Sequence, residues 1–128
     1  MTAIGKVRCA FDITTAAQVA AVASLQAPGA QAELERRRRL NSEGRPEIER
    51  ALRDHGFDPV GPAVANFVFA EVGEDSRPLF EQLLREGVIV RPTAGFGAPG
   101  AIRVSVGTPE ENAFFADALG RVTSAAPA

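Results

Sequence analysis

Two arginines in the last third of this 128-residue sequence stand at positions where their side chains could bind an anion. Arg91 follows the apolar run "VIV", and Arg103 lies in "AIRVSV", whose apolar residues alternate with polar or small ones. That alternation is typical of a strand with one apolar face, and it puts Arg103 on the opposite face. A planar guanidinium can donate two parallel hydrogen bonds to a carboxylate or a phosphate. The pattern therefore allows two interpretations: an anion site, or two arginines whose stems cover apolar surface at sheet edges.

Few other side chains could act as bases, nucleophiles or metal ligands. The sequence has one lysine, Lys6, one histidine, His55, and one cysteine, Cys9, and it has no tyrosine or tryptophan. All other basic residues are arginines, which do not act as bases at ordinary pH. Because an enzyme that works alone needs a cluster of such groups, we predict no catalytic residue and no metal site in this chain. We interpret Cys9 as a small apolar residue and His55 as the residue that ends a helix.

Two short motifs have structural explanations. The run "RRRR" at 36–39 has glutamates four residues away along the same predicted helix, so it is interpreted as a solvated helix face rather than a nucleic-acid site. The letters "GFGAPG" at 95–100 match a dinucleotide-binding pattern, but a strand follows them where that pattern requires a helix N-terminus. We therefore expect neither motif to bind a ligand.

The composition is that of one globular domain, with 45% apolar and 23% charged residues. A net charge of -2 gives no reason to expect nucleic acid or a membrane surface as a partner. No apolar run approaches the roughly 20 residues that a spanning helix needs, and the start lacks a secretory pattern. The sequence predicts a cytoplasmic protein.

The order of the predicted elements indicates an α+β fold. A long helix that contains Pro46 should kink near residues 41–45, because proline removes one backbone donor and crowds the preceding turn. Capping patterns place Ser76 at the start of one later helix, and Thr108 and Glu111 at the start of the last. The predicted helices are 14–27, 30–55, 76–86 and 109–122, and the predicted strands are 65–72, 88–91 and 101–106, with a Pro-interrupted edge before the first. We expect a two-layer domain in which helices cover a short sheet. The strand order stays open, and 65–91 could form a right-handed βαβ unit.

Four stretches together resemble one known family. They are "KVRCAFDITTAAQVAAVASL", "ANFVFAEV", "LFEQLLREGVIVRP" and "AIRVSVGTPEEN". In order and spacing they are similar to the C-terminal, small-domain part of histidinol-phosphate aminotransferases, which belong to the fold-type I (class I/II) pyridoxal-phosphate-dependent enzymes. One departure is Ala10-Phe11, where the family commonly has proline before phenylalanine.

The resemblance implies a domain division and a set of substrate-binding residues. Residues 1–13 would be a truncated interdomain segment, 14–122 the small domain and 123–128 a frayed tail. The residues that match substrate-binding positions of the family are Arg103, Arg91, Asn66 and Phe67. Lys6 matches a lysine beyond the Schiff-base position. The large domain that holds pyridoxal 5'-phosphate would therefore be absent, and this chain alone should bind no cofactor and be inactive.

The resemblance also implies a reaction and partners for the complete enzyme. The reaction would be amino transfer between histidinol phosphate and 2-oxoglutarate, a step of histidine biosynthesis, in a homodimer that includes the missing large domain. Two alternatives stay open: an aminotransferase of the same branch that acts on an aromatic amino acid, and a non-enzymatic interaction domain that reuses the fold.

Overall fold

The computed structural model describes residues 13–124, and the chain divides into two compact units between Arg36 and Arg37. One helix, α3 (Ala30–Asp54), contributes residues to both units. None of the helices in the described range is long and apolar enough to cross a membrane.

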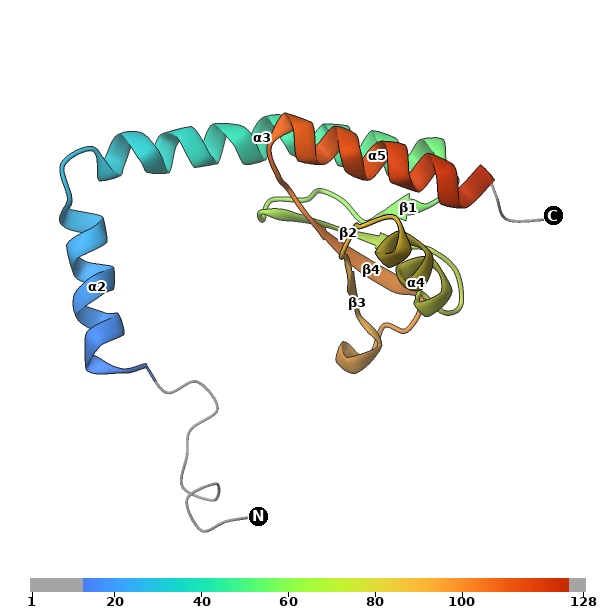
Figure 1. Cartoon of the computed structure of the whole chain (residues 1–128), viewed down its shortest axis with the longest axis horizontal. Coiled ribbons are helices and arrows are strands. Elements are labelled where there is room, and N and C mark those ends of the chain that lie inside the picture. Colours follow the sequence, from blue (N-terminus) through green and yellow to red (C-terminus); the bar gives the residue numbers. More distant parts are fainter. Residues whose placement is uncertain (1–12, 125–128) are drawn as a thin grey trace, which may run out of the picture. The chain divides into compact units, whose positions relative to one another are not determined.

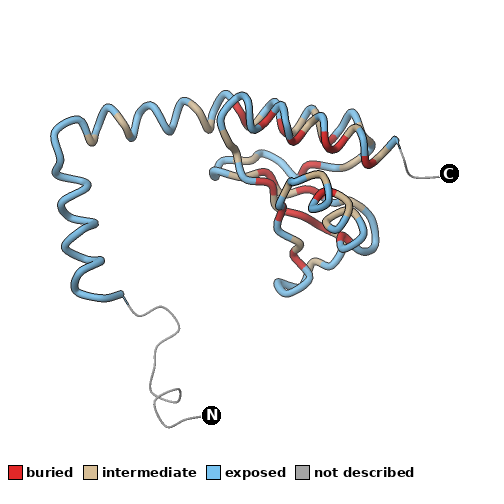
Figure 2. Tube along the Cα trace, viewed as in Figure 1, coloured by how far each residue is buried: buried red, intermediate tan, exposed pale blue. Residues whose placement is uncertain are grey.

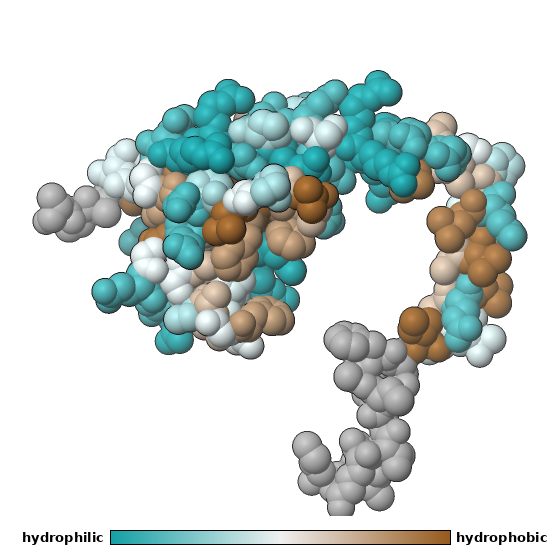
Figure 3. All heavy atoms as spheres, turned by 180° about the vertical axis from the view of Figure 1, so that it is seen from behind, coloured by the Kyte–Doolittle hydropathy of each residue, from teal (hydrophilic) through white to brown (hydrophobic). Residues whose placement is uncertain are grey.

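The first unit contains the helix α2 (Thr15–Gln26), which begins as predicted. Thr14 is its N-cap, and the Thr14 hydroxyl oxygen accepts a hydrogen bond from the Ala17 backbone N–H at 3.2 Å. Every residue of α2 is exposed, including Val19, Val22 and Leu25. Figure 3 shows brown, apolar surface along this helix. Residues 13–36 contain no buried side chain, so this part of the chain has no core of its own.

The second unit is the predicted α+β domain. After α3 come β1 (Asp58–Pro59), β2 (Phe67–Glu71), α4 (Arg77–Arg85), β3 (Arg91–Pro92), the short 3-10 helix η1 (Ala94–Phe96), β4 (Ala101–Ser105) and α5 (Pro109–Ser124). The sheet order is β1-β2-β4-β3, and every neighbouring pair is antiparallel. Because β4 lies between β2 and β3 and is antiparallel to both, β2 and β3 are parallel without pairing. Figure 1 shows that α5 lies beside the second half of α3. It also shows α4 on the same side of the sheet as these two helices.

The core lies between the sheet and the helices because apolar residues alternate along β2 and β4. Val68 and Ala70 on β2 and Ile102 and Val104 on β4 are buried in one cluster with residues of the helices. Figure 2 shows buried segments both on the strands and on the helices of this unit. The helices contribute Ile48, Leu52, Leu83, Phe115, Ala118, Leu119 and Val122. Burial of each large apolar side chain stabilises the fold by about 1.5–3 kcal/mol. Within residues 37–124, helices therefore cover one face of the sheet and leave the other face without a helix.

The helix ends test the predicted caps. At α5 the prediction is confirmed: the Thr108 N–H donates to the Glu111 carboxylate at 2.8 Å, and the Glu111 N–H donates back to the Thr108 hydroxyl at 3.3 Å. Gly56 follows α3 with a φ of 79°, as expected for a glycine that stops a helix. At α4 Ser76 is the N-cap residue, as predicted, but its side chain makes no cap hydrogen bond. Its hydroxyl donates instead to the Pro99 carbonyl at 2.8 Å.

Several other boundaries also differ from the sequence prediction. The strand expected at 88–91 pairs with β4 only through Arg91 and the following Pro92, and residues 88–90 lie outside the ladder. The last helix continues to Ser124, two residues beyond its expected end. Helix α3 runs through Pro46 without a break in its helical assignment, and the kink stays a prediction.

The loop between β3 and β4 is held by hydrogen bonds from buried hydroxyl groups. The Thr93 hydroxyl lies 2.8 Å from the carbonyl oxygens of both Ala98 and Ala101. The backbone N–H and the hydroxyl of Ser76 both donate to the Pro99 carbonyl. The loop is thus tied to the start of α4 and to the start of β4, which fixes where β4 begins.

Candidate functional site

Arg91 and Arg103 are direct partners in the antiparallel pair of β3 and β4. Both lie on the sheet face without helices, since Val90 and Val104, their neighbours along the strands, belong to the core. Arg103 is half-buried and Arg91 is exposed. The Cβ atoms of directly opposite residues in an antiparallel pair are only about 5 Å apart. The two guanidinium groups can therefore approach one ligand together.

Phenylalanine side chains from β2 lie beside Arg103. The guanidinium carbon of Arg103 is 4.8 Å from the centroid of the Phe67 ring, and Phe69 is the direct cross-strand partner of Arg103. A guanidinium that lies on an aromatic face is restricted in orientation, while the N–H groups at its edge stay free for an acceptor. Sequence reasoning found Phe67 but missed Phe69, although its spacing of two residues places it on the same face.

The electrostatics of this pair favour an anionic ligand. Like charges directly opposite each other on neighbouring strands destabilise a sheet. In the described range 13–124, no carboxylate forms an ion pair with Arg91 or Arg103. A bound carboxylate or phosphate would supply the missing negative charge and accept the hydrogen bonds that both guanidinium groups offer.

The fourth predicted residue, Asn66, directly precedes β2. Its backbone carbonyl accepts a hydrogen bond from the Val106 N–H at 2.9 Å, which continues the pairing of β2 with the chain after β4. The Asn66 side chain is exposed, and no hydrogen bond joins it to another residue of 13–124. The structure thus brings Arg91, Arg103 and Phe67 together on one face and places Asn66 at the end of the same strand.

Sequence reasoning missed a third arginine near these residues. Arg45 on α3 is half-buried, and its Nη1 donates a hydrogen bond to the Ala65 carbonyl at 3.0 Å, directly before Asn66. The pattern of the helix predicts no such contact, because it joins residues 20 positions apart in the chain.

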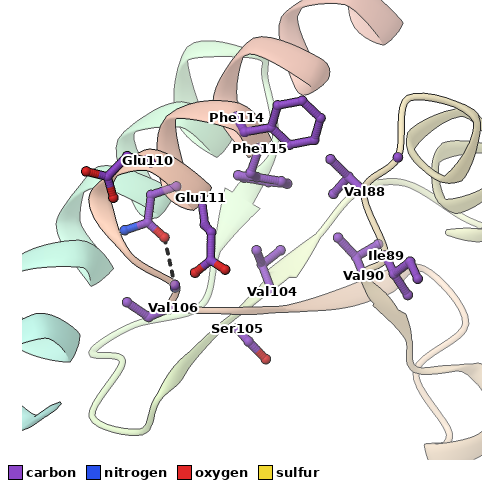
Figure 4. A pocket seen from close by; sticks show the side chains of 13 residues that line it. Val88, Ile89, Val90, Val104, Ser105, Val106, Glu110, Glu111, Phe114 and Phe115 are labelled. Atoms are coloured by element: carbon purple, nitrogen blue, oxygen red, sulfur yellow. Dashed lines mark hydrogen bonds between the residues drawn. The ribbon is translucent and has the colours of Figure 1, made fainter.

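A separate cavity of about 550 Å³ lies at the edge of the sheet, between residues 87–90, the end of β4 and α5. Figure 4 shows its wall of valine and phenylalanine side chains, with the carboxylates of Glu110 and Glu111 at one end. The pKa of Glu110 lies below its ordinary value because its carboxylate accepts hydrogen bonds from its own backbone N–H and from the Thr108 hydroxyl. None of the predicted substrate-binding residues lines this cavity.

The structure also shows what surrounds the other residues and motifs that the sequence singled out. His55 follows α3, and its Nδ1 lies 2.9 Å from the Thr123 hydroxyl of α5. Residues 36–39 are exposed, and Arg36 pairs with Glu33 at 2.7 Å. The strand β4 follows the "GFGAPG" segment, as expected. Lys6 and Cys9 lie outside the described residues. Within the described part, no group of three or more His, Cys, Asp or Glu side chains could hold a metal ion.

Comparisons with known proteins define the class. The profile of the family "Aminotransferase class I and II" matches residues 2–119. A histidinol-phosphate aminotransferase of Pseudomonas fluorescens is 39% identical over 96% of this chain and 32% of its own length. One from Methylococcus capsulatus is 42% identical over 93% of this chain and 31% of its own. The solved aspartate aminotransferase of Thermotoga maritima superimposes with a TM-score of 0.66 and 25% identity, over 88% of this chain and 29% of that one.

The chain belongs to the class I and II aminotransferases. It corresponds to part of the small domain of these enzymes, and it spans about a third of the length of the curated relatives that it matches. Both the predicted family and the predicted fold class are confirmed.

Members of this family depend on pyridoxal phosphate. The aldehyde of that cofactor is held by forming an imine with a lysine amine, and residues 13–124 contain no lysine. The described residues therefore lack the group that would hold the cofactor, and the chemistry that Arg91 and Arg103 offer is the binding of an anion.

Proposed function

We propose that this chain acts as the small domain of a pyridoxal-phosphate-dependent aminotransferase for histidinol phosphate and that it binds the anionic group of the substrate. The observation that carries the proposal is the direct cross-strand pairing of Arg91 and Arg103, without a carboxylate partner in the described part of the chain. The names of the curated relatives support the choice of substrate.

Each arginine has a distinct task in this proposal. Arg103 donates two parallel hydrogen bonds to the substrate phosphate or carboxylate, while the Phe67 ring keeps its guanidinium in one orientation. Arg91, which is exposed on the neighbouring strand, adds a second positive charge that a phosphate dianion needs more than a carboxylate does. Asn66 and Phe67 line the substrate side of the sheet end.

The proposal extends to the partners of the chain. A cofactor-binding large domain would supply the lysine, 2-oxoglutarate would accept the amino group, and the complete enzyme would be a homodimer in the cytoplasm. The lengths of the curated relatives, about three times that of this chain, support such a partner domain.

A chimeric enzyme tests the proposal. The full chain would replace the matching segment of the Methylococcus capsulatus relative, which leaves that protein its cofactor-binding portion. We expect amino transfer from histidinol phosphate to 2-oxoglutarate, with kcat/KM at least about 10-fold above that for phenylalanine, since a second guanidinium contributes a charge-assisted hydrogen bond to phosphate. A soluble, cofactor-loaded chimera that prefers phenylalanine would assign the aromatic alternative, and one without any amino transfer would contradict the proposal.

Replacement of Arg91 should change substrate choice. In the chimera, Arg91→Ala should lower kcat/KM for histidinol phosphate by about 10-fold and that for phenylalanine by less than about 2-fold, because only phosphate needs the second charge. Steady-state kinetics with both substrates measure this ratio. Arg85→Ala is the control, since Arg85 is an exposed arginine at the end of α4 that lies outside the site. Equal losses for both substrates would show that Arg91 does not recognise phosphate.

A further inference from the structure

We infer that Arg45 is a positioning residue for the substrate site: it holds the Ala65 carbonyl and thereby fixes Asn66 and Phe67 at the start of β2. This inference rests on the proposed function, because it assigns Arg45 a task in substrate binding.

Two successive carbonyl groups at the start of β2 are held from two different elements. The Ala65 carbonyl accepts a hydrogen bond from Arg45 Nη1 at 3.0 Å, and the Asn66 carbonyl accepts one from the Val106 N–H at 2.9 Å. The Asn66 backbone is therefore held on both sides of its Cα atom, the preceding peptide group by Arg45 of α3 and the following one by Val106 after β4. Its orientation sets the direction in which the Asn66 side chain leaves the backbone.

The chain before Asn66 has no other support of this kind. In the described part of the protein, the bond from Arg45 is the only hydrogen bond that residues 61–65 make. The residues of this segment are exposed apart from Ala63, which packs on the core. Without Arg45, the segment would be held only by that apolar contact and by the strand that follows it.

The position of Arg45 on α3 is itself rigid. The adjacent Gly44 is buried, and a Cβ atom there would lie 2.6 Å from both the Asn112 side-chain nitrogen and a Val106 methyl group. The Asn112 side chain also donates to the Glu47 carboxylate at 3.4 Å and accepts from the Gly107 N–H at 2.9 Å. One turn of α3 therefore contacts both the start of β2 and the chain that leaves β4, which are hydrogen-bonded to each other.

The charge of Arg45 is not used in a surface ion pair. Glu49, four residues later on α3, pairs instead with Arg53 at 3.0 Å. No carboxylate among residues 13–124 forms an ion pair with Arg45. Its one hydrogen bond therefore goes to a backbone carbonyl at the site, and a charged donor makes that bond stronger than a neutral one would.

Loss of this bond should weaken substrate binding more than it slows the chemical step. In the chimera with the full chain, Arg45→Met should raise KM for histidinol phosphate about 3- to 10-fold and change kcat less than about 2-fold, which corresponds to one hydrogen bond lost from substrate positioning. Arg45→Lys keeps a charged donor and should recover part of the loss. Arg50→Met removes an exposed arginine from the same helix as the matched control and should change neither constant.

A double-mutant cycle separates positioning from general stability. If Arg45 acts through Asn66, the variant with both Arg45→Met and Asn66→Ala should have the KM of Asn66→Ala alone. As a direct readout in the full chain, the backbone amide NMR shifts of Asn66 and Phe67 should move in Arg45→Met and stay in place in Arg50→Met. Additive effects in the cycle, or unmoved shifts, would overturn the inference.

The same enzyme distinguishes failure of the inference from failure of the proposed function. If Asn66→Ala and Arg103→Ala both leave KM and kcat unchanged, the proposed substrate site is wrong and the inference falls with it. If those two variants impair binding while Arg45→Met does not, the site stands and only the positioning role of Arg45 is overturned.

Discussion

Replacement of Arg103 by alanine should lower kcat/KM of the chimeric aminotransferase by roughly 30- to 1000-fold. This range corresponds to about 2–4 kcal/mol, the contribution of a charged and partly desolvated hydrogen-bonded pair. The loss should be this large because Arg103 lies between Phe69 and Arg91 in one row of the sheet, with its guanidinium on the Phe67 ring. The measurement is steady-state kinetics with histidinol phosphate and with phenylalanine. Both substrates carry an anionic group, so kcat/KM should fall for both.

Arg103→Lys is the matched variant. Lysine keeps the positive charge but cannot reproduce the two parallel hydrogen bonds, so it should recover only part of the loss. The alternative explanation, in which Arg103 merely covers apolar surface with its stem, predicts slightly lower stability and unchanged kinetics. Near-native kcat/KM of Arg103→Ala on both substrates would therefore rule out the anion site.

A second large effect is expected from Gly100→Ala, which should lower the free energy of unfolding of the chain by about 3 kcal/mol. A Cβ atom at Gly100 would collide with the backbone carbonyl oxygen of Gly73 and lie 3.2 Å from its carbonyl carbon. Since the obstacle is backbone, no change of side-chain rotamer can relieve it. The strand β4 starts at the next residue, so the displaced backbone would also disturb the register that places Arg103 opposite Arg91.

Urea unfolding of the full chain, followed by circular dichroism, measures this loss. Gly95→Ala is the control in the same loop, because a Cβ at Gly95 meets nothing within 4 Å and should change the midpoint little. If Gly100→Ala and Gly95→Ala unfold at the same urea concentration, the close approach of Gly100 to the Gly73 backbone does not require a glycine, and the prediction is wrong.

The parts of the structure that the sequence predicted correctly are those set by neighbouring residues. The capping box of Thr108 and Glu111 depends on residues three apart, and the alternation along 101–106 depends on residues two apart. Both patterns exist in the sequence before any tertiary contact forms. The last helix follows the same rule, because Phe115, Ala118, Leu119 and Val122 recur at helical spacing and are buried, whereas Phe114 is half-exposed beside the cavity at the sheet edge.

The features that the sequence did not predict depend on contacts between distant segments. Arg91 faces Arg103 only because β3 pairs with β4 across the loop between them, and the strand order was left open. The Ser76 hydroxyl does not cap α4 but donates a hydrogen bond to the Pro99 carbonyl, 23 residues away in the chain. The contact from Arg45 to Ala65 and the approach of Gly73 to Gly100 are likewise long-range. The roles of the four predicted residues came from the resemblance, and the structure adds their arrangement.

The strand order also has a consequence for how the second unit folds. The pairs that are consecutive in the chain, β1 with β2 and β3 with β4, are each only two residues long, too short to persist alone. The long central pair joins β2 to β4, between which α4 and β3 lie in the chain, so its formation closes a long loop at an entropic cost. Neither the β1–β2 pair nor the β3–β4 pair therefore forms a stable folding intermediate by itself. Collapse of the helices and closure of the central pair must coincide, so the unit should fold in a single cooperative transition at a rate limited by this long-range pairing.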